Sequence, residues 1–383
     1  MLYYLAEKIL MWAKDAQWQT YVSPLRIFRY ITFRSAGAAV TALVLSWILG
    51  PWMIRWLKEL KFGQEYRDRA EEQGGLTGRV DKRGTPTMGG ILIVLVVDLT
   101  ALLWCQWNTL VQLMSLTFIV LCGLGFLDDY AKITKQNAGG ITEFIKLWVQ
   151  GILAIFVAFY LWKLPTTTKM ISEVMVPFIK YPVLTGSIGA IVGIALTALT
   201  IVGTSNAVNL TDGLDGLATG CVVIVSFVFL VLSYLAGNFR TSQYLQIPYV
   251  PGAGELTVFA AGMVGAGLGF LWFNCHPAKV FMGDTGSLAL GGALGMLAVL
   301  IHQPLVMIIA GGVFVAEAGS VMIQRFYFKY TRIRYGEGRR VFLMAPLHHH
   351  FEKKGWYESQ VTMRFYIMCV LCAVVALSTL KIR

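Results

Sequence analysis

Charged residues are scarce in this sequence of 383 residues. They make up 14% of the chain, whereas hydrophobic residues make up 56% and the mean hydropathy is +0.64. A soluble globular domain carries about 25% charged residues. The composition therefore excludes an ordinary soluble enzyme and indicates a polytopic membrane protein.

Cysteine is also sparse. The six cysteines are scattered and lie mostly within apolar runs, so the sequence has no disulfide framework and no zinc or iron–sulfur signature. Cys369 and Cys372 have CxxC spacing, but no second pair accompanies them. We interpret them as two small apolar residues on one membrane helix.

A cleavable signal peptide is missing as well. The first 19 residues mix Leu, Tyr and Trp with charged residues and show no small-residue cleavage site. We expect residues 1–32 to form an interfacial amphipathic segment ahead of a catalytic bundle over residues 33–383, in a single polytopic membrane domain. The net charge of +11 indicates contact with anionic lipid or anionic substrate and not with nucleic acid.

Apolar stretches near the length of a bilayer crossing predict an all-α integral membrane protein with ten transmembrane helices. The expected spans are Ser35–Leu57, Met88–Trp104, Leu110–Leu127, Leu147–Leu161, Val183–Val202, Leu217–Leu235, Leu256–Phe273, Ser287–Ile301, Leu305–Ile323 and Met363–Leu380. Glycine is frequent in the later spans, which predicts close helix packing there.

Ten spans divide the connecting segments between two membrane faces. The odd-numbered segments hold about 20 Lys and Arg residues and the even-numbered segments about four. The positive-inside rule then places the odd segments in the cytoplasm and both termini in the periplasm. The even-numbered segment at residues 162–182 carries a β-branched run that can form a small hairpin.

The same odd-numbered segments carry nearly every unusual polar motif of the chain. The candidate site residues among them are Lys82 and Thr87, then Asp128, Asp129, Lys132 and Lys146, then Asn209, Asp212 and Asp215, then Asn274, Phe281 and Asp284, and finally His348, His349 and His350. Solvated loops without a shared role would distribute such motifs over both faces. The clustering predicts an active-site cleft at the cytoplasmic interface.

Asp128 and Asp129 directly follow the third expected span. Adjacent carboxylates at a membrane boundary repel each other, so one retains a proton or a cation binds. A plain polar flank that ends the helix is the alternative interpretation.

The residue types fit phosphoryl transfer. The carboxylates suit Mg²⁺, and lysines offset the charge of a diphosphate. Glycines beside Asp212, Asp215 and Asp284 allow backbone N–H groups to approach phosphate, although such pairs also form simple turns. Adjacent histidines cannot all face one ion, which favours hydrogen-bonding or phosphate-contacting roles with one of them structural. Asp98 and Glu317 fall within spans and are expected to be hydrogen-bonded inside the bundle, with a proton relay as the alternative.

These motifs resemble the bacterial phospho-N-acetylmuramoyl-pentapeptide transferase family, within the polyprenyl-phosphate hexosamine-1-phosphate transferase superfamily. The resemblance extends from about Thr32 to Arg383. It rests on Lys82–Gly90, Phe126–Lys132, Asn206–Gly216, Trp272–Gly292 and Ala345–Trp356. The aspartate motifs are shared across the superfamily, whereas the histidine motif with Gly355 and Trp356 is more specific to the muramoyl-pentapeptide branch.

The resemblance implies transfer of phospho-N-acetylmuramoyl-pentapeptide from UDP to undecaprenyl phosphate, with release of UMP and formation of lipid I for peptidoglycan and cell-wall synthesis. It implies Mg²⁺ dependence, a ten-helix fold with a cytoplasmic cleft in the bacterial inner membrane, and a homodimer.

The resemblance also implies roles for residues of this chain. Asp284 matches the Mg²⁺ ligand, Asp128 the residue that activates the lipid phosphate or acts as nucleophile, and Asp129 its essential neighbour. We also expect a catalytic role for His349. Substrate-binding candidates are Lys82, Thr87, Lys132, Lys146, Asn209, Asp212, Asp215, Asn274, Phe281 as the uracil-stacking aromatic, Gln324, His348 and His350.

Two other functions compete with this interpretation. A polyprenyl-phosphate N-acetylglucosamine-1-phosphate transferase shares the aspartate motifs. An ion-coupled transporter is compatible with glycine-interrupted helices, but its polar groups belong near mid-membrane and the sequence shows no inverted repeat.

Overall fold

The computed structural model describes residues 1–13, 19–60, 84–134 and 140–380. Within these ranges the chain forms helices joined by loops, with an antiparallel bridge between Val174 and Leu184. The elements are α1 (Leu2–Trp12), α2 (Gln19–Val22), the 3-10 helix η2 (Ser23–Arg29), α3 (Ile31–Glu59), α4 (Gly90–Trp104), α5 (Thr109–Thr134), α6 (Glu143–Lys163), α7 (Thr168–Ser172), α8 (Gly186–Thr211), α9 (Leu217–Ala236), α10 (Phe239–Leu245), α11 (Gly254–Asn274), α12 (Gly283–Leu300), α13 (Val306–Ala310), α14 (Gly312–Tyr335), α15 (Leu347–Lys353) and α16 (Glu358–Ser378).

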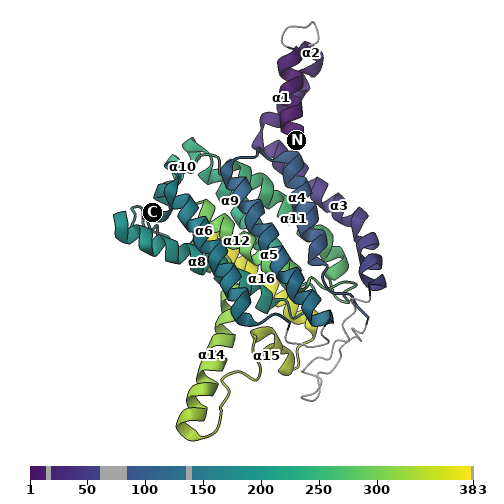
Figure 1. The fold of residues 1–383 in the computed structure, drawn as a ribbon, viewed down its shortest axis with the longest axis vertical. Coiled ribbons are helices and arrows are strands. Elements are labelled where there is room, and N and C mark those ends of the chain that lie inside the picture. Colours follow the sequence, from purple (N-terminus) through teal and green to yellow (C-terminus); the bar gives the residue numbers. More distant parts are fainter. Residues whose placement is uncertain (14–18, 61–83, 135–139, 381–383) are drawn as a thin grey trace.

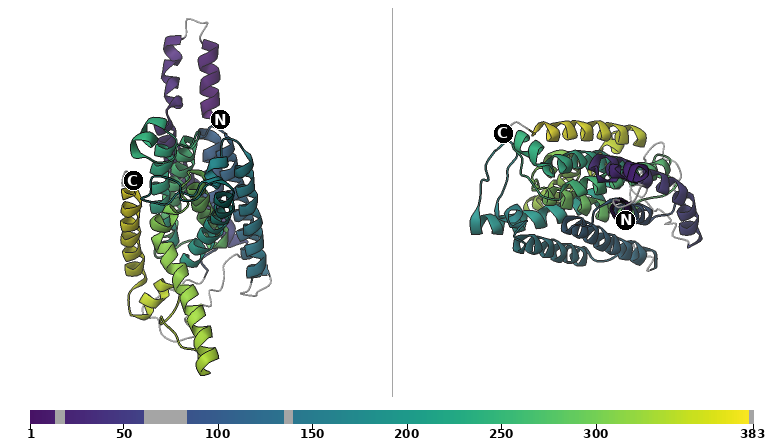
Figure 2. Two further views of the ribbon diagram at one scale, coloured as in Figure 1. Left: turned by 90° about the vertical axis from the view of Figure 1, so that its left-hand side faces the viewer. Right: turned by 90° about the horizontal axis from the view of Figure 1, so that it is seen from above.

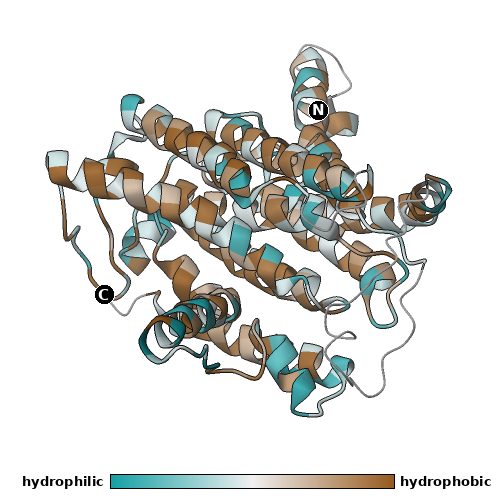
Figure 3. Cartoon of the chain, turned by 60° about the horizontal axis from the view of Figure 1, so that its bottom comes forward, coloured by the Kyte–Doolittle hydropathy of each residue, from teal (hydrophilic) through white to brown (hydrophobic). Residues whose placement is uncertain are grey.

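Eight helices of the described ranges are long and apolar enough to cross a membrane, namely α3, α5, α6, α8, α9, α11, α12 and α16. Helix α4 is equally apolar but has only 15 residues. Figure 3 shows hydrophobic residues along the helices of the bundle. Apolar side chains on the outer helices are exposed, as Ile152 on α6 and Ile191 on α8 illustrate at 61% and 70%. Such an exposed apolar surface suits lipid, and the helices confirm an all-α integral membrane protein.

The most buried helices are α12 and α11, with 89% and 72% of their apolar windows buried, compared with 28% for α3 and α8. Figures 1 and 2 show these two helices inside the bundle, with α3, α8 and α16 around them. Small residues permit this close packing. A Cβ on Gly265 of α11, for example, would overlap the Ala39 carbonyl of α3. The tight packing predicted from the glycine content is confirmed.

The ninth expected span, 305–323, is not one helix. It is divided into α13 and α14 at Gly311, whose N–H closes α13 on the Met307 carbonyl, 2.8 Å away. The Gly311 carbonyl then accepts the first hydrogen bond of α14, from Val315. Helix α14 continues to Tyr335, and its second half extends beyond the bundle (Figure 1). The apolar run in the sequence therefore marks only the first part of a longer, more polar helix.

The N-terminal segment projects from the opposite end of the bundle (Figures 1 and 2). Helix α1 stands along the long axis of the bundle (Figure 1). The Met1 amine donates to the carbonyls of Leu102 and Leu103, and Arg29 pairs with Glu7 at 2.6 Å. The first contact holds the N-terminus against the end of α4, and the second pairs α1 with η2. Together they account for the direction of the projection.

The segment 162–182 does not form the hairpin that its composition suggested. Helix α7 occupies part of it, and the Val174–Leu184 bridge supplies only two backbone hydrogen bonds, each of 2.9 Å. The Thr168 hydroxyl donates to the Leu164 carbonyl and favours a helical turn at this point.

The crossing of α4 and α12 gives a test of the packing. A Cβ on Gly90 would overlap the backbone of Gly286, so Gly90→Ala should force the two helices apart. We expect a loss of about 1–3 kcal/mol in the free energy of unfolding, seen as a lower melting temperature in detergent. Gly151→Ala on α6 is the matched control, because a Cβ there meets nothing within 4 Å. Equal melting temperatures for both variants would contradict this packing.

Candidate active site

Segments far apart in the sequence meet at one end of the bundle. Gly89, before α4, donates its N–H to the Phe281 carbonyl before α12. Asn209, at the end of α8, donates to Asp284, and the N–H of Asp215 donates to Glu358 of α16. The described parts of all five odd-numbered segments supply residues to this end of the bundle, as the distribution of motifs predicted. Lys82 lies outside the described residues.

A cavity of about 210 Å³ opens among these segments. It is lined by Thr87, Asp129, Lys132, Asn209, Asp212, Gly213, Leu214, Asp215, Asn274, Phe281, Gly283 and Asp284. Nine of these twelve residues are site candidates from the sequence. The motifs therefore predicted most of the cavity wall.

A cluster of carboxylates and lysines forms one side of the site. The last turns of α5 place Asp128, Asp129 and Lys132 on one face, and α6 begins just before Lys146. The Asp128 Oδ2 atom is 2.7 Å from the Nζ atoms of both lysines. The Asp284 Oδ2 atom is 2.9 Å from Lys132 Nζ and 3.0 Å from Lys146 Nζ. The two ammonium groups thus bridge two carboxylates from different helices.

Asp129 is bound by the N-terminus of α12. Its Oδ2 accepts the Thr285 N–H at 3.0 Å and the Thr285 hydroxyl at 2.7 Å, and its Oδ1 accepts the Asp284 N–H at 3.3 Å. A helix N-terminus stabilises negative charge through its unpaired N–H groups and dipole. Gly283 has φ of +73°, and a Cβ there would overlap Asp129 Oδ2, so only glycine fits.

Helix α8 supplies the next two polar groups. The Asn209 amide donates to Asp284 Oδ1 at 2.8 Å and to the Ser287 hydroxyl at 2.9 Å, which orients the Asp284 carboxylate. Asp212 follows the last residue of the helix. Burial raises the pKa of Asp212 to about 8, and the neighbouring carboxylates add to the effect. Several carboxyl groups therefore converge on the cavity.

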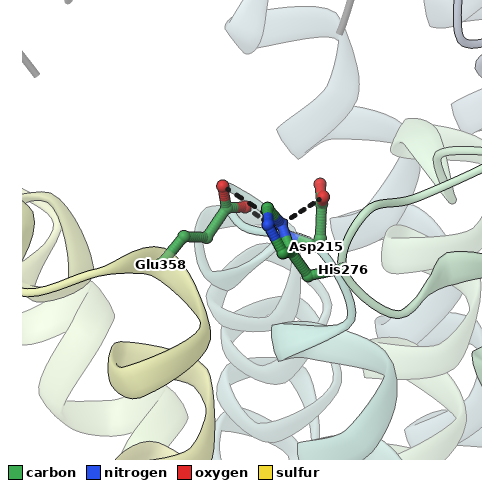
Figure 4. Close-up of side chains that lie close together, drawn as sticks. All are labelled: Asp215, His276 and Glu358. Carbon is green, nitrogen blue, oxygen red and sulfur yellow. Dashed lines mark hydrogen bonds and ion pairs between the residues drawn. The ribbon is translucent and has the colours of Figure 1, made fainter. Parts of the chain in front are cut away.

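The donor set fits a divalent cation. Asp128, Asp129 and Asp284 each offer a carboxylate oxygen, and these atoms lie within 4.8 Å of one another. Oxygen ligands of this kind suit hard cations such as Mg²⁺. A cation would also relieve the repulsion that raises the pKa of Asp212. A second group of potential ligands comprises Asp215, His276 and Glu358 (Figure 4).

The opposite wall carries Asn274 and Phe281. The Asn274 carbonyl oxygen accepts the Thr219 hydroxyl at 2.7 Å, and its amide donates to the Val280 carbonyl at 2.9 Å. These bonds fix the end of α11 and the connection to α12 around the Phe281 ring. The wall therefore combines an aromatic face with polar groups.

The three consecutive histidines of α15 have three different partners. His348 is buried, with its Nδ1 3.2 Å from Glu317 Oε2, and burial lowers its pKa. The His349 Nδ1 is 2.7 Å from Glu352 Oε2, and the His350 Nδ1 accepts the Leu343 N–H. The expectation that they do not share one metal agrees with this arrangement. His348 lies against Gly213, which lines the cavity, and is itself outside the lining.

Comparison with known proteins places the chain in a family. The model for glycosyl transferase family 4 matches residues 111–302, and phospho-N-acetylmuramoyl-pentapeptide-transferase signature 1 matches residues 82–94. A phospho-N-acetylmuramoyl-pentapeptide-transferase from Opitutus terrae is 47% identical over 369 residues, covering 96% of this chain and 99% of its own. The chain belongs to the phospho-N-acetylmuramoyl-pentapeptide-transferase family.

Further relatives support the assignment. Proteins of the same name from Methylacidiphilum infernorum and Syntrophus aciditrophicus are 48% and 46% identical, each over 95% of this chain and 97% of its own. The matched ranges include α5, α8 and α12, which carry the carboxylates and Asn209. The chain is thus a multi-pass bacterial membrane protein of this transferase family.

Gln324 occupies a different place from the one expected. It does not line the cavity, because its amide is used to hold a loop. Its Oε1 accepts the N–H groups of Val341 and Phe342, each at 3.0 Å, and its Nε2 donates to the Phe342 carbonyl. Lys146 is also absent from the lining, but it contacts the site through Asp128 and Asp284.

Five residues that contact the candidate site were not among the site candidates from the sequence. Glu317 and Glu352 orient histidines, Thr285 binds Asp129, and His276 and Glu358 contact Asp215. Only Glu317, as a carboxylate within a span, stands out in the sequence, and its expected burial in the bundle is confirmed. The others become visible only through their partners.

The raised pKa of Asp212 predicts a pH dependence of stability. The pKa of the Asp212 carboxyl is about 3.9 in the unfolded chain and about 8 in the folded one. Between these two values the folded state therefore binds more protons than the unfolded state. The contribution of Asp212 to stability therefore falls as pH rises through this window. We expect Asp212→Asn to flatten the decline in melting temperature from pH 5 to pH 8.5, measured in detergent with a chelator. Glu337→Gln, at an exposed site, should keep the wild-type slope. Parallel curves for wild type and Asp212→Asn would contradict the prediction.

Proposed function

We propose that this chain transfers phospho-N-acetylmuramoyl-pentapeptide from UDP to undecaprenyl phosphate, releasing UMP and forming lipid I. The full-length similarity to proteins named for this transfer supports the proposal. The observation that carries it is the cluster of Asp128, Asp129, Asp284, Lys132 and Lys146 at the end of the apolar bundle. A lipid phosphate and a soluble nucleotide can both reach such a position.

In this reaction an oxygen of the lipid phosphate forms a bond to the sugar-bearing phosphorus of the donor. The bond between that phosphorus and the oxygen of UMP breaks, and UMP leaves with the electron pair. Lys132 and Lys146 lie where their charge offsets that of the phosphates. We favour direct attack by the lipid phosphate, because a deprotonated phosphate monoester is already a competent nucleophile and its second pKa is only about 6.

Mg²⁺ is the proposed cofactor, and Asp284, with Asp128 and Asp129, would hold it. When bound, the ion would neutralise charge on the diphosphate. Asn209 fixes the orientation of Asp284, and the N-terminus of α12 fixes that of Asp129. His349, oriented by Glu352, is proposed to act on the donor from α15.

We further propose ten membrane crossings, which are the eight long apolar helices together with α4 and the first part of α14. The excess of Lys and Arg in odd-numbered segments supports a cytoplasmic active-site cleft and periplasmic termini. The chain is proposed to be one membrane domain that forms a homodimer in the inner membrane.

The experiment that tests the function compares two donors. Purified protein receives undecaprenyl phosphate, Mg²⁺ and either UDP-N-acetylmuramoyl-pentapeptide or UDP-N-acetylglucosamine, and labelled lipid product and UMP are measured. We expect product from the first donor only. Product from the second donor alone would make this chain an N-acetylglucosamine-1-phosphate transferase.

Asp284→Asn tests the cation site. The amide keeps the shape of the side chain but removes the charge that a hard cation and two lysines contact. We expect turnover to fall by about 100-fold or more while the melting temperature stays close to wild type. Glu143→Gln is the control, because the Glu143 side chain, at the start of α6, is 81% exposed. Near-normal turnover with unchanged Mg²⁺ dependence would remove Asp284 from the proposed cation site.

A further inference from the structure

Three residues from separate segments meet beside the cavity, namely Asp215, His276 and Glu358 (Figure 4). The Asp215 Oδ2 atom is 3.1 Å from His276 Nδ1 and accepts the Ala278 N–H at the same distance. Since a carboxylate only accepts hydrogen bonds, the Nδ1 atom of His276 donates. The Asp215 N–H donates to Glu358 Oε1 at 2.8 Å, and Glu358 Oε2 lies 3.7 Å from His276 Nδ1.

Of these three residues only Asp215 lines the cavity. The side chains of Asp215 and Glu358 are 2% and 5% exposed, and that of His276 is 27% exposed. His276 and Glu358 therefore stand behind the wall and touch it through Asp215. Their bonds hold both the side chain and the backbone of that residue.

Helix α16 contacts the same turn at a second point. The Tyr366 hydroxyl donates to the Gly216 carbonyl at 2.6 Å. Gly216 has φ of +72° and is the first residue before α9, so the chain reverses direction there. The turn at residues 213–216 is thus fastened to α16 by a carboxylate and a hydroxyl, two turns of helix apart.

The other anchor of Asp215 is the connection between α11 and α12. That connection carries His276 and Ala278, and on either side of them Asn274 and Phe281 line the cavity. Asp215 therefore joins two parts of one wall. If His276 or Glu358 is lost, the turn at residues 213–216 can move away from the α11–α12 connection. Asp215 then no longer faces the same ligand as Asn274 and Phe281.

We propose that His276 and Glu358 are positioning residues for the part of the cavity that binds the UDP portion of the donor, and that they act through Asp215. The inference rests on the proposed function. The aromatic ring of Phe281 with the polar groups of Asn274 and Asp215 suits a nucleoside, which needs one flat apolar contact and a few hydrogen bonds. The carboxylates and lysines for phosphoryl transfer come from α5, α6 and α12, so they keep their geometry when this wall is disturbed.

The test measures UDP affinity by calorimetry, together with KM and kcat for the full donor. Glu358→Ala and His276→Phe each remove a hydrogen bond to Asp215. We expect the Kd for UDP and the KM to rise about ten-fold, the effect of one hydrogen bond to a charged group, while kcat stays within about two-fold. Glu358→Gln and His276→Asn each retain one hydrogen-bonding atom and should restore most of the affinity.

A double-mutant cycle shows whether His276 acts through the Asp215 side chain. Once Asp215→Ala is present, His276→Phe should add little to the loss of UDP affinity, because the acceptor of its hydrogen bond is already gone. Additive losses would overturn the proposed route. Glu337→Gln, at an exposed site, should leave affinity and turnover unchanged.

Other results would overturn the inference as well. Unchanged UDP affinity in Glu358→Ala and His276→Phe would do so. A fall in kcat as large as the rise in KM would also do so, if the conservative variants show the same lower melting temperature. The conservative variants decide the matter if the larger changes do not fold. A wild-type chain that binds UDP and transfers phospho-sugar while the variants match it would refute this inference alone. A wild type that does neither would refute the proposed function, and this inference with it.

Discussion

The site depends on the balance of charge around Asp284. Its carboxylate lies in the first turn of α12, the most buried of the candidate spans, and contacts Lys132, Lys146 and Asn209 from three other helices. Charges buried at the end of an apolar bundle are costly unless they are paired. Because each group needs the others, the ends of α5, α6, α8 and α12 are held together by the residues that the proposed chemistry uses.

Close helix packing makes this arrangement possible. The α4–α12 crossing at Gly90 and Gly286 and the positive φ of Gly283 bring backbone to backbone beside Asp129. A bulkier residue at Gly90 or Gly286 would push α12 away from α4, and one at Gly283 would overlap the Asp129 carboxylate of α5. Packing and charge balance are therefore coupled at one end of the bundle.

The C-terminal part of the chain supports this site from outside. Helix α14 places Glu317 against His348, which lies against Gly213, and α15 pairs His349 with Glu352. Helix α16 then fastens the turn at residues 213–216 through Glu358 and Tyr366. These elements add no charge to the carboxylate–lysine cluster. They set the shape of the walls around it.

The sequence by itself determined the membrane class, eight of the ten expected spans and the motifs that line the cavity. Hydrophobic runs and charge asymmetry are local signals, and the aspartate motifs keep their chemistry wherever the fold places them. Nine of the candidate residues, Asp129 and Asp284 among them, line the cavity for this reason.

Only the tertiary structure decided how these groups are held. The pairs Asp215–Glu358 and Lys132–Asp284 are separated by 143 and 152 residues, and their contact depends on helix register and crossing. The break at Gly311, the use of Gln324 to hold a loop and the outward direction of α1 were likewise outside its reach. In each case the partner that decides the role of a residue lies on another element, and no local pattern identifies it.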